Sequence, residues 1–395
     1  MDEIRIGVLG NVDSGKTTLI SVLKYGELDN GRGSARSKVF KHPHEKETGR
    51  TSSISHTYLN MEKKYISFVD MAGHQKYLKT TMYGINGASL DYVMILVGAN
   101  MGVLKMTREH LGIALSLKIP TIIVITKIDI CPESIKQQTI DDIKKILHKP
   151  MVKKTPISIN DMIDNNLNLD TYIPICEVSN TKGINIDLLR NYLKTLSPNN
   201  KWIALQNEKK MVVIDSNYLV QGIGIVISGV VTSGVISTGD KILMGPFNGV
   251  FRQVLIKSIH NNFNTAISSI AAGNSGCFNL KFLEKKIEFK RRHIKKGMVL
   301  LDNTYTDKSY YEFLAEVKVL HHPTTIRINY EPVIHCGSVS QTAKICEMDC
   351  DYIRTGDKAN IKFRFKRYPE FLEKNTKLMF REGKTKGIGI IKELY

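Results

Sequence analysis

The stretch that decides the fold lies close to the N-terminus and is Gly10-Asn11-Val12-Asp13-Ser14-Gly15-Lys16-Thr17. Positions 4–9 are rich in branched apolar residues and positions 18–23 have a helical pattern, so the stretch joins a predicted strand to a predicted helix. This context is typical of a phosphate-binding P-loop, in which glycines let backbone N–H groups turn toward an anion at a helix N-terminus. The alternative is a chance match in a glycine turn.

The P-loop predicts a first set of ligand-binding residues. We expect the Lys16 side chain to reach the β- and γ-phosphates of a nucleotide and the Thr17 hydroxyl to bind Mg²⁺. The residues predicted to surround the phosphates are Asn11, Val12, Asp13, Ser14, Gly15, Lys16, Thr17 and Thr18.

The length, charge and cysteine content of the chain limit the classes of protein to which it can belong. The 395 residues suffice for two or three domains, and a formal net charge of +18 favours a polyanionic partner, although compositional drift toward Lys, Ile and Asn is an alternative. No apolar run is long enough to cross a bilayer, and Met1-Asp2-Glu3 shows no secretory signal. Six scattered cysteines predict buried free thiols in a reducing compartment rather than a zinc site. We expect a cytoplasmic monomer without a membrane partner.

A polar segment from Tyr25 to about Ser55 follows the first helix. After a P-loop such a segment is predicted to be a switch that orders around the γ-phosphate and Mg²⁺, the alternative being an ordinary surface loop. A hydroxyl in it would complete the metal shell, and both Thr51 and Ser53 qualify.

Predicted strands over 56–62 and 65–69 lead into Asp70-Met71-Ala72-Gly73-His74. A carboxylate at the end of a strand near a P-loop can hold Mg²⁺ through water, so Asp70 joins Thr17 as a predicted metal residue. Gly73 lets its backbone N–H approach the γ-phosphate. His74 lies where it could orient or polarise an attacking water, the alternative being a surface or core histidine.

A predicted apolar strand over 120–125 ends in Thr126-Lys127-Ile128-Asp129. A carboxylate at Asp129 can accept hydrogen bonds from N1 and N2 of guanine, a donor pair that adenine lacks. The Lys127 stem would pack along the base, and the Thr126 hydroxyl stands where the usual motif has Asn. After a last strand over 173–178, the backbone of the loop Ser179-Asn180-Thr181-Lys182-Gly183 could contact guanine O6, with Ser179 and Asn180 as the predicted site residues. The order of these motifs indicates a GTPase.

The fold predicted from these patterns is an α/β P-loop GTPase domain followed by two all-β barrel domains, with limits at 1–198, 209–303 and 311–395. Further helices are predicted over 107–117, 134–148 and 184–196, with a polar stretch up to Leu169. Strands of the last unit are predicted over 313–320, 334–339, 359–365, 377–381 and 388–394. A basic run over 285–296 is either a solvated charged hairpin or a patch that follows phosphates.

The chain resembles the translational GTPases, the class of elongation factor Tu, eukaryotic elongation factor one-alpha and the ribosome-rescue GTPases, and especially the eukaryotic GTP-binding protein one/two group. The stretches that carry the resemblance are Asp-Met-Ala-Gly-His-Gln-Lys-Tyr (70–77), Gly-Arg-Thr-Ser-Ser-Ile (49–54), Val-Leu-His-His-Pro-Thr-Thr-Ile (319–326), His-Cys-Gly-Ser-Val-Ser-Gln-Thr-Ala (335–343) and Phe-Arg-Glu-Gly-Lys-Thr-Lys-Gly-Ile-Gly (380–389).

The resemblance implies roles for particular residues. His74 would be the water-positioning histidine, engaged when a ribosomal RNA loop docks, and Asp13 would help to bind a monovalent cation beside the phosphates. Ser53 would be the switch hydroxyl on Mg²⁺, at a position where elongation factors have Thr. The chain differs from elongation factors at three places, and the resemblance implies that these differences are typical of the subgroup. They are Ala72 in place of Pro, Ser53 in place of Thr, with Ser52 at an often apolar position, and Thr126 in place of Asn.

Two functions follow as hypotheses. The first is a translational GTPase that hydrolyses GTP with Mg²⁺ and couples hydrolysis to the ribosome and tRNA, including aminoacyl-tRNA, in an elongation-like or rescue and quality-control role. The alternative is a GTP-gated switch that acts in RNA decay or docks protein partners without delivering tRNA.

Overall fold

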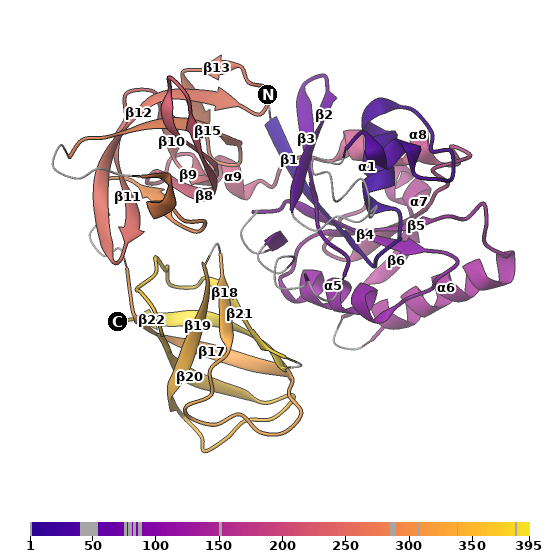
Figure 1. Ribbon diagram of the computed structural model, residues 1–395. Helices are drawn as coiled ribbons and strands as arrows, with labels where there is room; N and C mark the ends of the chain where they lie inside the picture. Colours follow the sequence, from indigo (N-terminus) through magenta and orange to yellow (C-terminus); the bar gives the residue numbers. More distant parts are fainter. Residues whose placement is uncertain are drawn as a thin grey trace. The chain divides into compact units, whose positions relative to one another are not determined.

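The computed structural model describes residues 2–39, 54–74, 77, 81, 84–85, 89–149, 152–284, 290–305, 309–337, 339–383 and 385–395. The chain divides into two compact units, with the main boundary between residues 199 and 200 (Figure 1).

The first unit is built on a seven-stranded sheet with the order β2-β3-β1-β4-β5-β7-β6. All neighbouring strands are parallel except β2 and β3, which form an antiparallel hairpin. The sheet is therefore mostly parallel. The strands are β1 (Asp2–Gly10), β2 (Ser55–Met61), β3 (Lys64–Asp70), β4 (Tyr92–Gly98), β5 (Thr121–Thr126), β6 (Thr155–Ser158) and β7 (Tyr172–Glu177).

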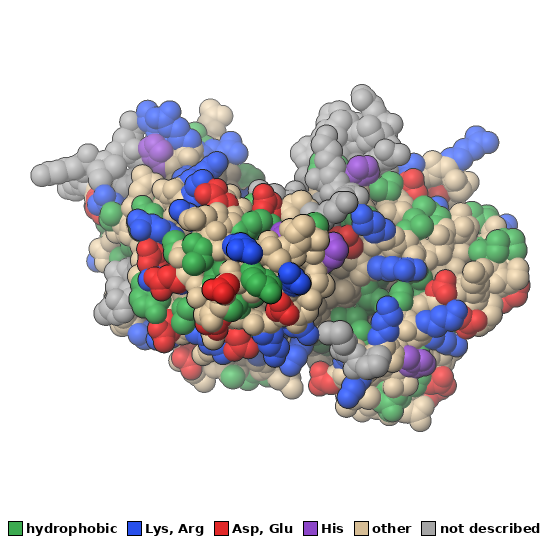
Figure 2. Space-filling model, turned by 90° about the horizontal axis from the view of Figure 1, so that it is seen from below, with side chains coloured by type: hydrophobic (Ala, Val, Ile, Leu, Met, Phe, Trp, Pro, Cys, Tyr) green, Lys and Arg blue, Asp and Glu red, His purple; other side chains and the backbone are tan. Residues whose placement is uncertain are grey.

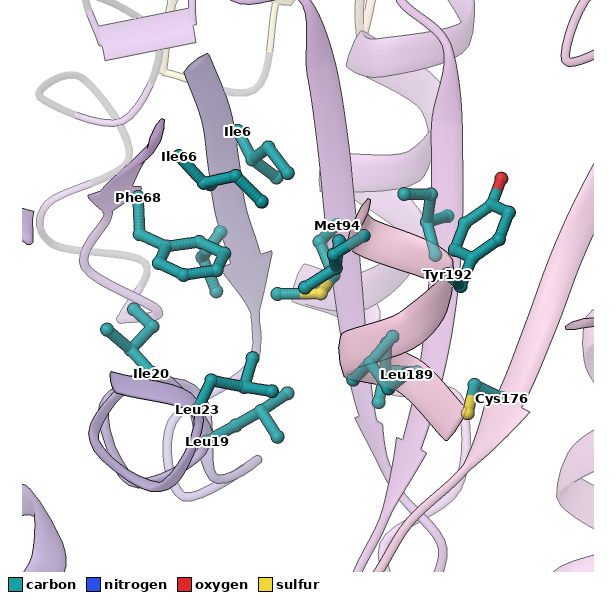
Figure 3. Packing of buried hydrophobic residues seen from close by; sticks show 14 of the residues in the cluster. Ile6, Leu19, Ile20, Leu23, Ile66, Phe68, Met94, Cys176, Leu189 and Tyr192 are labelled. Atoms are coloured by element: carbon teal, nitrogen blue, oxygen red, sulfur yellow. The ribbon is translucent and has the colours of Figure 1, made fainter. Parts of the chain in front are cut away.

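Helices cover both faces of this sheet (Figure 1). Leu19, Ile20 and Leu23 on one helix and Leu189 on another point into the same apolar core, against strand residues such as Phe68 (Figure 3). Burying these side chains is the main force that holds helices to the sheet. The helices are α1 (Lys16–Tyr25), α2 (Ser34–Ser37), α5 (Lys105–Ser116), α6 (Glu133–Leu147), α7 (Ile159–Asp164) and α8 (Ile186–Thr195).

The polar stretch predicted before Leu169 is wrong in part, because it contains β6 and α7. Strand β6 lies at the edge of the sheet and includes Pro156, so it lacks the apolar run that identifies a central strand. The Ser158 side chain accepts a hydrogen bond from the Asp161 backbone N–H and caps α7. Two buried residues of this short helix, Ile159 and Met162, join the core.

The second unit begins with α9 (Lys201–Leu205), which the sequence reasoning missed, and then forms the first barrel. Its sheet has the order β11-β16-β8-β9-β15-β12-β13, and pairing of β11 with β12 closes the ring. The strands are β8 (Met211–Val220), β9 (Gly224–Ser233), β10 (Val235–Ser237), β11 (Lys241–Phe247), β12 (Val250–Asn261), β13 (Ala266–Ile267), β14 (Ser269–Ala271), β15 (Ser275–Phe282) and β16 (Val299–Leu301). Of the basic run, residues 285–289 lie outside the described residues, and Arg291–His293 form a short 3-10 helix rather than a hairpin strand.

The second barrel is closed in the order β17-β20-β19-β18-β21-β22. The single strand predicted over 334–339 is wrong: a turn at Gly337, whose φ is 51°, separates β18 from β19. The strands are β17 (Glu312–His321), β18 (Val333–Cys336), β19 (Val339–Met348), β20 (Lys358–Phe365), β21 (Lys377–Glu382) and β22 (Thr385–Leu394). The fold is thus an α/β domain followed by two β-barrels, as predicted.

All six cysteines are free, but only Cys176 and Cys336 are fully buried and Cys350 is exposed, so the prediction of buried thiols is only partly correct. Within the part of the chain that the structure describes, no helix is long and apolar enough to span a bilayer. Lys and Arg side chains are spread over the face shown in Figure 2, interspersed with acidic ones.

Candidate nucleotide-binding site

The predicted motifs meet at one edge of the first sheet. Gly10 ends β1, Asp70 ends β3 and Thr126 ends β5, while the Ser179–Asn180 loop follows β7. Because these strands are parallel, their carboxyl ends share an edge, which is where α/β proteins bind ligands.

The P-loop has the backbone that its glycines allow. Gly10 has a φ of 148° and Gly15 a φ of 81°, and a Cβ on Gly10 would lie 2.4 Å from the Leu96 carbonyl oxygen. Helix α1 begins at Lys16, directly after Gly15, so the loop leads into a helix N-terminus. The backbone N–H groups of a helix's first turn and the partial positive charge of that end favour an anion at this place.

Lys16 is held inside the P-loop. Its Nζ donates to the carbonyl oxygens of Asn11 at 2.7 Å and Gly10 at 3.3 Å. Burial lowers the pKa of Lys16, and the charges of Asp70 and Asp13 act in the opposite direction. A buried ammonium group of this kind is suited to a phosphate ligand, which would offset the cost of its desolvation.

Two predicted metal residues lie together. The Thr17 Oγ1 donates a hydrogen bond of 2.6 Å to Asp70 Oδ2, and Asp70 is fully buried at the end of β3. A hydroxyl and a carboxylate in contact beside a phosphate loop are the hard oxygen ligands that Mg²⁺ prefers, so these residues fit the ion. The third predicted metal residue, Ser53, lies outside the described residues, as does Thr51.

Gly73 lies directly against the P-loop. A Cβ at this position would lie 2.6 Å from both the Gly10 carbonyl oxygen and Lys16 Nζ, so only glycine fits here without a shift of the loop. His74 follows and is exposed, with its ring edge-on to Tyr77 at 6.3 Å between centroids. The structure therefore brings the Asp-x-x-Gly-His motif beside the phosphate loop and leaves the histidine accessible.

Thr126 connects the predicted base motif to the P-loop. Its hydroxyl donates a 2.8 Å hydrogen bond to the Ser14 carbonyl oxygen, and the side chain is completely buried. Lys127 adopts a left-handed backbone, with a φ of 61°. The threonine hydroxyl thus bridges the base motif and the phosphate loop at the position where the usual motif has Asn.

Asp129 is oriented by the loop that follows β7. Thr181 Oγ1 donates to Asp129 Oδ2 at 2.8 Å, and Thr181 also contacts the Ser179 hydroxyl at 3.1 Å. Partial burial would raise the pKa of Asp129, but hydrogen bonds from Ser179 and Thr181 outweigh it and lower the pKa. The carboxylate is therefore ionised and positioned to accept hydrogen bonds. The sequence predicted Ser179 as a site residue and placed Thr181 in the same loop, but it gave no role to the Thr181 hydroxyl that holds Asp129.

Asn180 lies between the base motif and the P-loop. Its Nδ2 would be 3.4 Å from a Cβ on Gly15, and its buried Oδ1 has no hydrogen-bond partner among the described residues. The Asn180 carbonyl accepts a 2.9 Å hydrogen bond from the Asp29 backbone N–H. A buried polar atom without a partner at this place indicates that a bound ligand completes the site.

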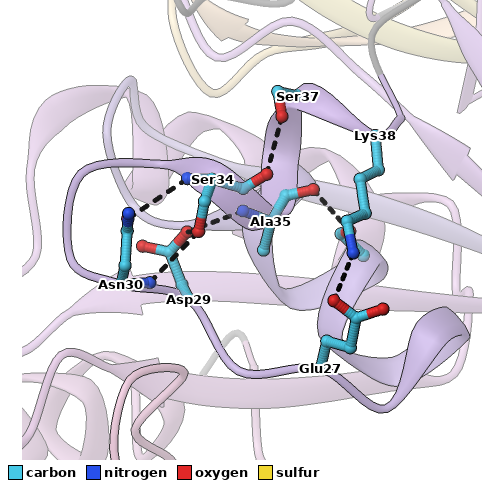
Figure 4. Close-up of polar contacts among 8 residues, drawn as sticks. Glu27, Asp29, Asn30, Ser34, Ala35, Ser37 and Lys38 are labelled. Atoms are coloured by element: carbon cyan, nitrogen blue, oxygen red, sulfur yellow. Dashed lines mark hydrogen bonds and ion pairs between the residues drawn. The ribbon is translucent and has the colours of Figure 1, made fainter.

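Asp29 organises the segment that follows α1. Its carboxylate accepts hydrogen bonds from the backbone N–H groups of Gly31, Gly33 and Ala35 at 2.9, 3.2 and 2.9 Å. Figure 4 shows Asp29 beside Ser34 and Ala35. Lys38 pairs with Glu27 across the same turn. Asp29 was not predicted, because an aspartate in a polar loop gives no signal of long-range contact. It joins the base loop to the start of the predicted switch.

His110 on α5 was also missed, because the sequence indicated only a helix there. Burial and the charge of Lys16 lower the pKa of His110 to about 3, so the imidazole is neutral. Neither ring nitrogen has a hydrogen-bond partner among the residues that the structure describes.

Residues 1–199, half of the chain, match the family model of the elongation factor Tu GTP-binding domain. The chain belongs to the translational GTPases. It is 41% identical to GTP-binding protein 1 of Xenopus laevis, with 99% of this chain aligned to 63% of that protein. It is 36% identical to human GTP-binding protein 2, with 99% of this chain aligned to 69% of that protein. The chain therefore spans slightly less than two thirds of the length of the frog protein and slightly more than two thirds of the length of the human one.

The fold of this GTPase is shared by more distant proteins. Translation elongation factor SelB from Methanococcus maripaludis, in complex with a GTP analogue, has a TM-score of 0.73 and 18% identity and aligns over all of this chain and 80% of its own. The GTPase-like domain of S. cerevisiae Ski7, bound to GTP, has a TM-score of 0.74 and 13% identity, with 98% of this chain and 97% of that chain aligned. Elongation factor 1-alpha of Desulfurococcus mucosus is 28% identical over 99% of this chain and 96% of its own. These two solved structures therefore show that the fold of the chain is shared over nearly its whole length.

Proposed function

We propose that this chain hydrolyses GTP to GDP and phosphate with Mg²⁺ and that hydrolysis is coupled to the ribosome and tRNA in the cytoplasm. The observation that carries the proposal is the convergence of the motifs at one edge of the sheet, where Thr126 contacts Ser14 and Thr17 contacts Asp70. These contacts join the base, phosphate and metal residues into one site.

Each residue has a role in this proposal. Lys16 and the loop amides from Asn11 to Thr18 bind the phosphates, and Asp129 accepts from guanine, with Lys127, Ser179 and Asn180 around the base. Thr17, Asp70 and Ser53 would hold Mg²⁺, which neutralises phosphate charge when bound, and Asp13 would bind a monovalent cation. Phosphoryl transfer depends mainly on such positioning and charge neutralisation.

His74 is proposed to align the attacking water. Its exposure beside Gly73 and the P-loop supports this role, because a ribosomal RNA loop could reach it there. Without the ribosome the chain lacks this alignment, so its basal turnover is expected to be slow. The net charge of +18 supports an RNA partner through the salt-dependent release of counterions.

The test is GTP turnover with and without ribosomes, across a salt series, with and without aminoacyl-tRNA. We expect ribosomes to stimulate turnover, and the stimulation to fall as salt rises. Turnover that ribosomes leave unchanged would contradict the proposal and favour the GTP-gated switch in RNA decay or protein docking. Stimulation that does not depend on aminoacyl-tRNA would favour rescue or quality control over an elongation-like role.

A further inference from the structure

A pocket opens in the first unit, away from the candidate nucleotide site. It has a volume of about 600 Å³ and is lined by the end of α1, the β2–β3 hairpin and the last turns of α8. Lys64 starts β3 and Asp70 ends it, and at about 3.3 Å per residue the two lie roughly 20 Å apart. The pocket and the predicted metal site are therefore at opposite ends of the same strand.

The pocket has a strongly cationic lining. Five cations and one carboxylate, Glu62, contribute to it, so the lining has a formal charge of +4. The cations are Lys24, Lys63, Lys64, Arg190 and Lys194. Among the described residues none of these five forms an ion pair, whereas lysines elsewhere in the same unit do, such as Lys136 with Glu133 and Glu177.

Two of the cations are fixed in place by helix ends. Arg190 Nη2 donates to the carbonyl oxygen of Leu23 at 2.7 Å, at the end of α1. Lys64 Nζ donates to the carbonyl oxygen of Lys194 at 2.6 Å, at the end of α8, and burial lowers the pKa of Lys64. These contacts satisfy carbonyl groups that would otherwise repel an anion. Arg190 Nε is buried and has no hydrogen-bond partner among the described residues.

The side chains of the other three cations make no such hydrogen bond to a helix end among the described residues. Lys24, Lys63 and Lys194 are exposed, come from three different elements and line the same pocket. Lys24 Nζ lies 5.1 Å from the centroid of the Tyr25 ring, which Lys38 Nζ approaches to 5.8 Å, and Tyr25 is 43% exposed, so an aromatic residue adjoins one of the pocket cations. Cations with a neighbouring exposed aromatic ring form the combination by which proteins bind the backbone and bases of nucleic acids.

We propose that this pocket binds the phosphodiester backbone of RNA. It would be a second RNA-contacting surface, in addition to the contact proposed at His74 beside the nucleotide site. The proposal rests on the proposed function and adds to it a place of contact on the GTPase domain. RNA is favoured over an acidic protein because it carries a charge at every nucleotide, and because the whole chain has a net charge of +18. The volume lies within the range of small-ligand sites, roughly 300–1,000 Å³, and Leu23, Leu59 and Met61 contribute apolar surface beside the cations.

The test compares two variants of the full chain with equal charge. The pocket variant carries Lys24→Gln, Lys63→Gln and Lys194→Gln, and it spares Lys64 and Arg190, whose contacts support the fold. The control variant carries Lys144→Gln, Lys149→Gln and Lys153→Gln, which are exposed lysines outside the pocket. Fluorescence anisotropy measures binding of a labelled RNA hairpin across a potassium chloride series, and a fluorescent GTP analogue reports nucleotide affinity.

The pocket variant is expected to bind the hairpin about tenfold or more weakly, with a slope of log affinity against log salt that is shallower by about 2–3, since up to three phosphate contacts are lost. The control variant should change much less, and both should keep their nucleotide affinity. Equal losses in the two variants would overturn the assignment. The assignment would also be overturned if polyglutamate displaced the labelled hairpin as effectively as unlabelled RNA does, when both competitors are added at the same concentration of charge. If ribosomes failed to stimulate GTP turnover by the wild type, that result would count against the proposed function. It would not decide the RNA-binding role of the pocket, because the hairpin affinities of the two variants test that role separately.

Discussion

The hydroxyl of Thr126 donates a 2.8 Å hydrogen bond to the main-chain carbonyl of Ser14, 112 residues earlier in the chain. Ser14 belongs to the phosphate loop, and Thr126 ends the strand that leads into the predicted base motif. This bond therefore fixes the spacing between the two halves of the nucleotide site. In this chain a hydroxyl makes the link.

Replacing Thr126 by Val should weaken nucleotide binding. The substitution keeps the shape of the side chain but leaves the Ser14 carbonyl without this donor, a loss of about 1 kcal/mol or roughly fivefold in affinity. Equilibrium titration with a fluorescent GDP analogue measures the effect. Thr126→Ser keeps the hydroxyl and is the matched control. Equal affinities for Val and Ser variants would show that the bond does not support the site.

Replacing Gly73 by Ala should impair GTP turnover. The new Cβ would lie 2.6 Å from the Gly10 carbonyl oxygen and 2.6 Å from Lys16 Nζ, so the motif must move away from the phosphate loop. Gly112→Ala on α5 is the control, since nothing lies within 4 Å of that position and alanine favours a helix by about 1 kcal/mol. Turnover assays and thermal melting of both variants separate a local clash from unfolding. A Gly73 variant with wild-type turnover would refute the close approach.

Replacing Asp129 by Asn should change base preference from guanine toward xanthine. In the proposed site the carboxylate would accept hydrogen bonds from two guanine donors, whereas an amide can donate to the extra oxygen of xanthine. Competition between GTP and xanthosine triphosphate for a labelled nucleotide measures the change. We expect GTP affinity to fall by at least about tenfold, since a buried polar partner is left unmatched. Unchanged GTP affinity would remove Asp129 from the base site.

Glu370 in the second barrel should make stability depend on pH. Burial raises the pKa of Glu370 to about 7, although a hydrogen bond from Gln341 and the charge of Lys295 lower it. A carboxyl whose folded pKa is raised binds its proton more tightly when folded, so the free energy of unfolding falls as pH rises from 4.5 to about 7. Glu370→Gln should remove this loss.

Thermal melting at about pH 5 and about pH 8 tests this expectation. The wild type should lose more stability between the two pH values than Glu370→Gln does. Glu347→Gln, which changes an exposed carboxylate of the same barrel, should behave as the wild type does. A Glu370 variant with the full pH dependence would show that another group titrates in this range.

Much of this architecture could be predicted because its signals are local. The P-loop needs glycines at fixed positions, and the buried central strands are continuous apolar runs, so Gly15 and β5 were evident from the sequence. Strand β6 was missed because an edge strand with a proline lacks that run. The roles of Thr181 and Asp29 were missed because their partners lie far away in the sequence, and no local pattern encodes such a contact.

The central claim is that this GTP site is switched on by RNA through His74. Single-turnover GTP hydrolysis on purified ribosomes, measured for wild type and His74→Ala, tests it most directly. We expect ribosomes to accelerate only the wild type, with a difference of about 100-fold or more, the usual size of a lost proton-transfer or water-positioning group, while GTP affinity is equal. Equal rates for the two proteins on ribosomes would contradict the claim.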